Sequence, residues 1–181
     1  MLDKNLLLVD IGGTNIRYAY SNIGDSDFVF ENKAELDSLN DFNNLMSDLL
    51  ADSDVKNIVF SVAGPKVNNS IKMTNRDFEI DADEVRKRFD LESCYLLNDW
   101  ESIGYSIRTF SENDFDNFKD GEPFNDTFLV IGPGTGLGAS IITGNNVIAT
   151  EIGNTNLGLS ALKSLLNINS DELNVLEDII S

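Results

Sequence analysis

Two short stretches place glycine and threonine together after apolar runs: "VDIGGTN" from Val9 to Asn15, and "VIGPGTGLGAS" from Val130 to Ser140. Glycine inside regular structure costs stability, so such a cluster indicates a backbone that bends tightly or closely approaches another group. An anion held by backbone N–H groups is one such group. An ordinary glycine-rich turn explains either stretch alone. Two such turns facing each other would clamp a polyphosphate, and the pair is much less expected by chance.

Acidic and amide side chains follow two of the predicted strands. Asp10 ends the first strand, where it could hold Mg²⁺ through water, because magnesium keeps part of its hydration shell. Asn98 and Asp99, in "YLLNDWESI", stand where a strand ends and a helix begins. Helix capping and catalysis both explain this pair, and both can hold at once. The chain has no histidine, which excludes Ser-His-Asp and Cys-His catalysis within it and leaves proton transfer near neutral pH to a carboxylate.

Two other nucleotide-binding motifs do not fit. No G-x-x-x-x-G-K-[ST] occurs, so a P-loop is excluded. The stretch "GTGLGA" matches one variant of the dinucleotide-binding fingerprint, but that motif must open a helix. Here it runs into "SIITGNNVIAT", which favours a strand, so a Rossmann site is a poor interpretation.

Composition limits the function classes. The 181 residues are 41% apolar, enough for a folded core, and the formal net charge of -18 disfavours nucleic acid and anionic membranes as partners. Cys94 is the only cysteine, so no intramolecular disulfide forms and a reducing compartment is expected. The N-terminal apolar run is too short for a signal peptide, and no stretch is long enough to span a bilayer. These features predict a cytoplasmic protein.

Hydrophobic periodicity predicts the order β-β-α-β-α-β-α for the first part of the chain, which indicates an α/β sheet with helical crossovers. The acidic, turn-rich residues 111–126 read as a hinge between two lobes. A strand "FLVI", a hairpin turning at Gly144 to Asn146, and a helical stretch from Leu159 onward are expected after it. The predicted domains are therefore a small lobe at 1–110, the hinge at 111–126, and the start of a second lobe at 127–181.

The motifs "DIGGTN", "AGP", "MTN", "LNDW" and "GPGTGLG" occur in an order and spacing that resembles the bacterial glucokinase family. These are sugar kinases of the actin-like ATPase superfamily, and the resemblance covers residues 5 to about 154. It implies an actin-like ATPase (ribonuclease-H-like) fold with a mixed sheet. In this chain the first lobe would be nearly complete and the second lobe only partial.

The resemblance also implies roles for particular residues. Asp99 of "LNDW" would be the catalytic base, with Asn98 and Asn75 as sugar contacts. The two glycine-threonine turns would bind the phosphates of ATP, through Gly12, Gly13, Thr14, Asn15, Gly134, Thr135 and Gly136.

The sequence departs from the family after the second turn. Family members carry "G-E-G-G-H", whose glutamate and histidine contact the hexose, and the matching stretch here is "TEIGN". Glu151 is kept, although a solvated surface carboxylate explains it equally from the residues alone, and Asn154 replaces the histidine. Family members also continue with another sugar-binding glutamate, an adenine pocket and a C-terminal helix that returns to the first lobe. These 181 residues include none of the three.

The expected reaction is ATP- and Mg²⁺-dependent phosphorylation of a hexose, most simply of glucose at its 6-hydroxyl. The alternative is a non-catalytic sugar- or phosphate-binding domain, or one half of a split or truncated kinase. Apolar surface left by the short second lobe predicts that the isolated chain self-associates, binds ATP weakly and is barely active. A homodimer or a complementary second-lobe chain would cover that surface.

Overall fold

The computed structural model describes residues 3–12, 15–35, 37–51, 53–73, 78–119, 121–122, 125–133 and 137–150. Its main element is a five-stranded mixed sheet with the order β3-β2-β1-β4-β8. β1 pairs antiparallel with β2 and parallel with β4, which pairs parallel with β8. The strands are β1 (Leu6–Ile11), β2 (Asn15–Ser21), β3 (Val29–Glu35), β4 (Asn57–Val62) and β8 (Ser93–Asn98).

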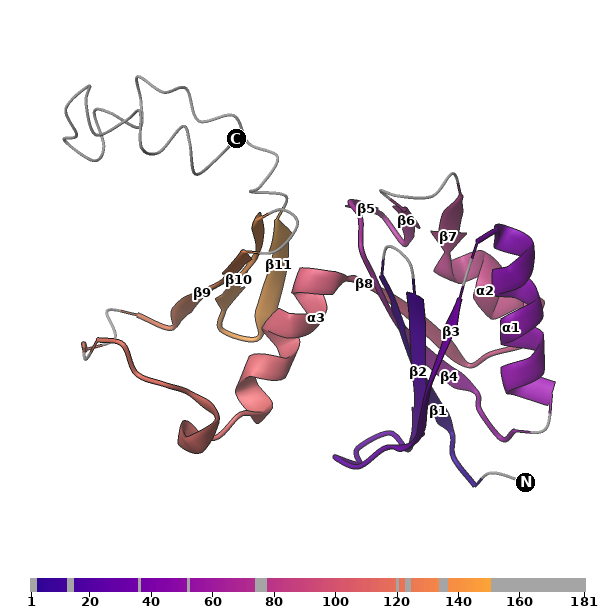
Figure 1. The fold of residues 1–181 in the computed structure, drawn as a ribbon, viewed down its shortest axis with the longest axis horizontal. Coiled ribbons are helices and arrows are strands. Elements are labelled where there is room, and N and C mark those ends of the chain that lie inside the picture. The colour runs from indigo at the N-terminus through magenta and orange to yellow at the C-terminus, as the bar shows by residue number, and fades with distance from the viewer. Residues whose placement is uncertain are drawn as a thin grey trace, which may run out of the picture.

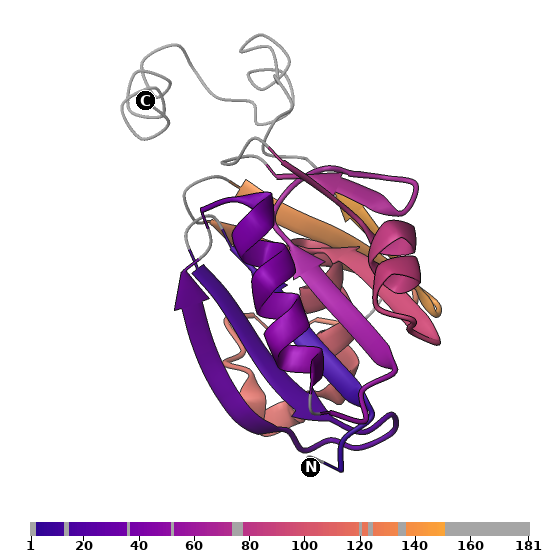
Figure 2. The same cartoon turned by 90° about the vertical axis from the view of Figure 1, so that its right-hand side faces the viewer.

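Two helices cover one face of this sheet, α1 (Leu39–Ala51) and α2 (Ala82–Arg88), as Figure 2 shows. Along β1 the buried side chains alternate with less buried ones, so a single face of the strand enters the main core. Phe42 and Met46 of α1 are buried against that face, and the Phe42 ring lies 5.8 Å from the ring of Phe60 in β4. Burying these apolar side chains is the main favourable contribution to folding.

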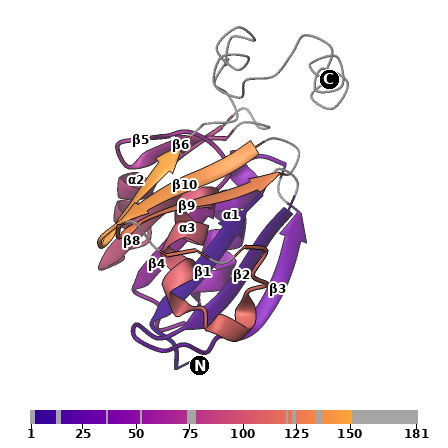
Figure 3. The same ribbon diagram turned by 90° about the vertical axis from the view of Figure 1, so that its left-hand side faces the viewer.

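A third helix, α3 (Asp99–Ser106), lies on the opposite face, between the five-stranded sheet and a second, three-stranded sheet (Figures 1 and 3). The second sheet has the order β11-β10-β9 and consists of β9 (Thr127–Pro133), β10 (Leu137–Thr143) and β11 (Asn146–Thr150). Two 3₁₀ turns, η1 (Ile107–Thr109) and η2 (Glu112–Asp114), follow α3. Because α3 contacts both sheets, it packs the three-stranded sheet against the five-stranded sheet.

A small antiparallel sheet projects beyond the ends of β4 and β8. It contains β5 (Lys66–Val67), β6 (Ser70–Lys72) and β7 (Glu79–Asp81), in the order β5-β6-β7. Gly64, which precedes β5, has φ of 152°, a conformation that side-chain-bearing residues rarely adopt. A Cβ there would also lie 2.6 Å from the Lys72 carbonyl oxygen, so this glycine is required by its turn.

The α/β class, the mixed sheet and the helical crossovers agree with the sequence prediction. The prediction missed β3, because "VFENKAE" lacks the apolar alternation that marks a half-buried strand. The stretch after the dinucleotide-like motif is a strand, β10, which confirms that the Rossmann interpretation fails. The expected helix from Leu159 lies outside the described residues. The division at residues 110 and 126 stays a prediction. No helix in the described part of the chain is long and apolar enough to cross a membrane.

Candidate active site

The carboxyl ends of three parallel strands meet at one edge of the main sheet. Ile11 at the end of β1 is level with Val62 at the end of β4, which is level with Asn98 at the end of β8. In open α/β sheets, ligands bind at this edge. Asp10 lies one residue before the end of β1, and Asp99 follows β8 directly. The fold thus brings the predicted base and the predicted magnesium ligand to the same edge.

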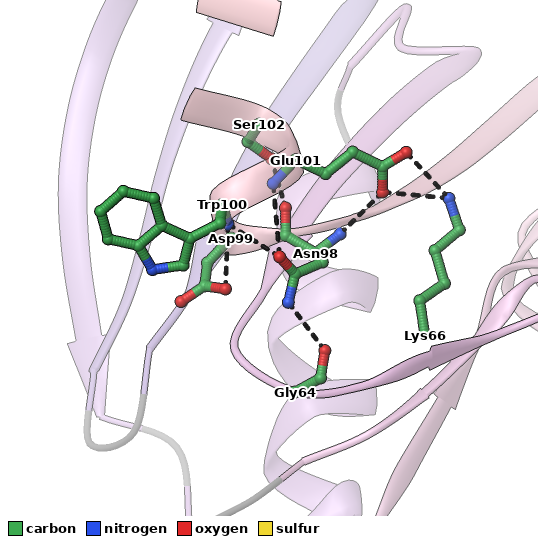
Figure 4. A network of polar contacts seen from close by, with 7 residues as sticks. All are labelled: Gly64, Lys66, Asn98, Asp99, Trp100, Glu101 and Ser102. Atoms are coloured by element: carbon green, nitrogen blue, oxygen red, sulfur yellow. Dashed lines mark hydrogen bonds and ion pairs between the residues drawn. The ribbon is translucent and has the colours of Figure 1, made fainter. Parts of the chain in front are cut away.

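Asn98 caps α3 with its side chain (Figure 4). Its Oδ1 accepts hydrogen bonds from the backbone N–H groups of Trp100 (2.9 Å) and Glu101 (3.3 Å). Its Nδ2 donates to the carbonyl oxygen of Gly64 at 2.9 Å. Asn98 is only 3% exposed. These contacts confirm helix capping, and the sugar contact predicted for Asn98 stays a prediction.

Glu101 completes the cap from the third position of the helix. Its Oε2 accepts from the backbone N–H of Asn98 at 3.1 Å, which forms a capping box. The same oxygen lies 3.2 Å from Nζ of Lys66 in β5, and the Glu101 side chain is only 11% exposed. This ion pair, drawn in Figure 4, ties the small sheet to the start of α3. Sequence reasoning missed both residues, although Glu three positions after Asn98 is the spacing of a capping box.

Asp99 is the first residue of α3 and is partly buried. Burial raises the pKa of its carboxyl above the usual range, and the nearby Asp10 carboxylate adds to this, although hydrogen bonds to backbone N–H groups oppose it. One of those bonds is donated by Trp100 N–H to Oδ1 at 3.0 Å. A carboxylate with a raised pKa accepts a proton more readily, which suits a general base.

In the first glycine-threonine turn, the structure describes the two end residues, Gly12 and Asn15. Gly12 N–H donates to the carbonyl oxygen of Asn15 at 3.0 Å, which closes the connection between β1 and β2. Of the described residues, a Cβ at Gly12 would meet only that oxygen, at an ordinary 3.6 Å. The described part of the protein therefore shows no contact that excludes a side chain at Gly12. Gly13 and Thr14 lie outside the described residues.

The second glycine cluster has a different explanation at two of its four positions. Gly132 in β9 and Gly138 in β10 are opposite each other in the sheet. A Cβ at either position would overlap the indole ring of Trp100. The group that these two glycines approach closely is thus a side chain of the protein. Gly134, Thr135 and Gly136, the predicted phosphate contacts, lie outside the described residues.

Asp10 and Asp99 are the carboxylates at the strand-end edge that a hydrated magnesium ion could use. Asp10 is exposed, and its carboxylate is near enough to Asp99 to affect that residue electrostatically. Among the described residues, no group of three or more His, Cys, Asp or Glu side chains could hold a metal. Mg²⁺ commonly takes one or two carboxylates and keeps several waters.

Three predicted sugar contacts, Asn75, Glu151 and Asn154, lie outside the described residues.

A groove of about 570 Å³ runs along the face of β1 and β2 beside α3. Its walls include Leu8, Tyr18, Leu97 and Tyr105. The walls are mainly apolar, which suits a packed protein element better than a hexose with many hydroxyls. Asp10 is one of the residues that line it, so the groove adjoins the strand-end site.

This chain is similar in sequence to known glucokinases. The family model described as "Glucokinase" matches residues 7–166. A glucokinase from Colwellia psychrerythraea is 33% identical over 150 residues, covering 77% of this chain and 44% of the relative. The chain spans about two fifths of the length of other curated relatives that match most of it.

Solved structures show the same fold. The glucokinase of an Antarctic psychrotroph has a TM-score of 0.67 at 24% identity, covering 92% of this chain and 56% of that one. A glucokinase of Balamuthia mandrillaris, in complex with glucose, has a TM-score of 0.62 at 20% identity, covering 91% and 53%. The mixed sheet, the crossover helices and the second sheet therefore form part of the actin-like ATPase fold. With the family model matching most of its length, this chain belongs to the glucokinase family.

Proposed function

We propose that this chain carries the base and the phosphate-binding turns of an ATP-dependent glucokinase, which transfers the γ-phosphoryl group to the 6-hydroxyl of glucose. The observation that carries the proposal is Asp99, a partly buried carboxylate with a raised pKa at the strand-end edge beside Asp10. Family membership supports the reaction class. The Balamuthia structure with glucose supports the sugar.

In this proposal Asp99 accepts the proton of the attacking sugar hydroxyl. Phosphoryl transfer depends mostly on positioning and on neutralising charge, so the base must be held in place. The Asn98 cap and the Glu101–Lys66 pair provide that restraint at the start of α3. The hexose would be held by Asn75, Asn98, Glu151 and Asn154.

The phosphates of ATP would be held by backbone N–H groups and threonine hydroxyls of the two turns. Among the described residues, a Cβ at Gly12 would make only an ordinary contact of 3.6 Å, to the Asn15 carbonyl oxygen, which is compatible with close approach of a phosphate to the first turn. Asp10 would hold Mg²⁺ through water, and the ion would neutralise charge on the phosphate oxygens. The proposed contacts are Gly12, Gly13, Thr14, Asn15, Gly134, Thr135 and Gly136.

A second candidate is a kinase half, or a binding domain, that needs a partner chain for catalysis. The observation that favours it is the apolar surface on the described residues. The groove beside α3 is open, and several large apolar side chains of the second sheet are about half exposed. These side chains are Phe128, Leu129, Ile131, Leu137 and Ile148. The partner would be a second copy or a complementary second-lobe chain, in the cytoplasm.

The experiment is a coupled assay for glucose 6-phosphate on the purified chain, with and without the C-terminal portion of the Colwellia relative beyond the matched region. We expect slow phosphorylation by the chain alone and a large increase on complementation. Glucose binding without phosphorylation in either arm would favour a binding domain. If the chain neither binds glucose nor phosphorylates it in either arm, both candidates are contradicted.

A further inference from the structure

The indole of Trp100 lies on a platform made of two glycines from the second sheet. The six-membered ring covers Gly132 and the five-membered ring covers Gly138, since a Cβ at each position would overlap those atoms. Directly opposed residues of antiparallel strands point to the same face of a sheet. The two glycines therefore leave one continuous flat area that admits the ring.

The same helix face makes a second close fit one turn later. Gly104 follows Trp100 by one helical turn, so both lie on the face of α3 toward the second sheet. A Cβ at Gly104 would lie 2.7 Å from Oγ of Ser140 in β10 and 2.5 Å from Cγ1 of Val147 in β11. A large helix residue, Trp100, thus meets two small sheet residues, and a small helix residue, Gly104, meets two larger ones. This complementarity allows little sliding between α3 and the hairpin.

Trp100 is also covalently next to Asp99, and its backbone N–H donates to both Asp99 and Asn98. In Figure 4 its ring points away from the Glu101–Lys66 side of the cap. Trp100 therefore takes part in the helix cap through its backbone N–H, and its side chain packs on the second sheet. A shift of the ring on its platform would change the separation between Asp99 and the β9–β10 hairpin.

We propose that Trp100 is a positioning residue that fixes β9 and β10 relative to Asp99. This rests on the proposed function, in which Asp99 is the base and the connection between β9 and β10 contacts phosphate. A misplacement of about 1 Å can cost on the order of 10²-fold in rate. Removing the indole should therefore lower kcat much more than it raises KM for glucose.

The packing of Trp100 on its two-glycine platform is tested first by fluorescence, because Trp100 is the only tryptophan of the chain. Gly138→Ala should displace the indole, which shifts its emission to longer wavelength and increases quenching by acrylamide. Gly121→Ala is the matched control, since a Cβ there meets no atom of the described residues within 4 Å. An emission spectrum of Gly138→Ala that equals the control would overturn the proposal.

The positioning role is tested by Trp100→Ala and Trp100→Phe in the complemented glucose assay. We expect Trp100→Ala to lower kcat by roughly 10- to 100-fold, and Trp100→Phe to restore most of the rate because a ring still fills the platform. Hydrogen exchange of β9 and β10 amides should accelerate in the alanine variant only. A normal kcat for Trp100→Ala would overturn the positioning role and leave the proposed function intact. If the unsubstituted protein transfers no phosphate, the proposed function fails, and emission and exchange still decide whether Trp100 holds the hairpin.

Discussion

Asp99 illustrates a conflict between stability and function at one residue. Its carboxyl is partly buried beside Asp10, and burial raises its pKa. An acid whose pKa is higher in the folded state than in the unfolded state destabilises the fold once it ionises. The penalty is absent below the unfolded pKa and is complete above the folded pKa. Asp99 is thus kept at a cost that the fold alone does not require.

Asp99→Asn should therefore raise the thermal midpoint at pH 7, because it removes the desolvated charge and keeps the size of the side chain. The gain should disappear below about pH 4, where the carboxyl is protonated in both states. Thermal unfolding of both forms at a series of pH values measures this. A lower midpoint for the variant at pH 7 would show that the carboxylate stabilises the start of α3.

Gly12 allows a second test at the residue scale. Gly12→Ala should leave the fold unchanged, because among the described residues the added Cβ meets only the Asn15 carbonyl oxygen, at 3.6 Å. If phosphate approaches this backbone, the methyl group should weaken ATP binding and leave glucose binding largely intact. Calorimetric titrations of the variant and of Gly121→Ala provide the comparison. Equal ATP affinity in the two variants would mean that Gly12 serves only the turn.

At the scale of elements, the Lys66–Glu101 pair connects the small sheet to α3. Lys66→Met leaves the Glu101 carboxylate without its cation in a largely buried position, which should cost up to about 3 kcal/mol in unfolding free energy. Adding Glu101→Gln removes that charge, and the glutamine carbonyl can still accept from Asn98 N–H. The double variant should then be more stable than Lys66→Met in denaturant unfolding. The opposite order would contradict this account of the pair.

The sequence predicted the elements whose signals are local. Asn98 caps α3 because Asn is a favoured N-cap residue, and that was readable from "LLNDWES". The edge strand β3 was not readable, because its sheet supplies hydrogen bonds that override a polar pattern. The platform under Trp100 was not readable either, because it requires knowledge of which distant strands pack on α3. The residues of the second glycine cluster left a plain turn and a bound ligand as alternatives, and Gly132 and Gly138, which were not among the predicted phosphate contacts, serve packing against Trp100.

For the whole molecule, the described residues leave two apolar surfaces open, the groove beside α3 and the half-exposed side chains of the second sheet. Large contiguous apolar surfaces on a single chain often mark an interface. We therefore expect the isolated chain to form dimers or larger assemblies. Adding a complementary second-lobe chain should replace these assemblies with a complex of the two chains. Light scattering across a concentration series measures the mass in each case. A monomer that persists at high concentration would contradict the prediction.

The most direct test of the central claim, that Asp99 is the base of a glucose kinase, is a single-turnover measurement. The chain in excess is mixed with γ-³²P-labelled ATP, Mg²⁺ and glucose, and labelled glucose 6-phosphate is followed for the unsubstituted chain and for the Asp99→Asn variant. The account predicts slow transfer to glucose that increases as pH rises through the raised pKa of Asp99, and a loss of about 10²- to 10⁴-fold in Asp99→Asn. Equal transfer by both forms, or label that is released only as inorganic phosphate, would contradict it.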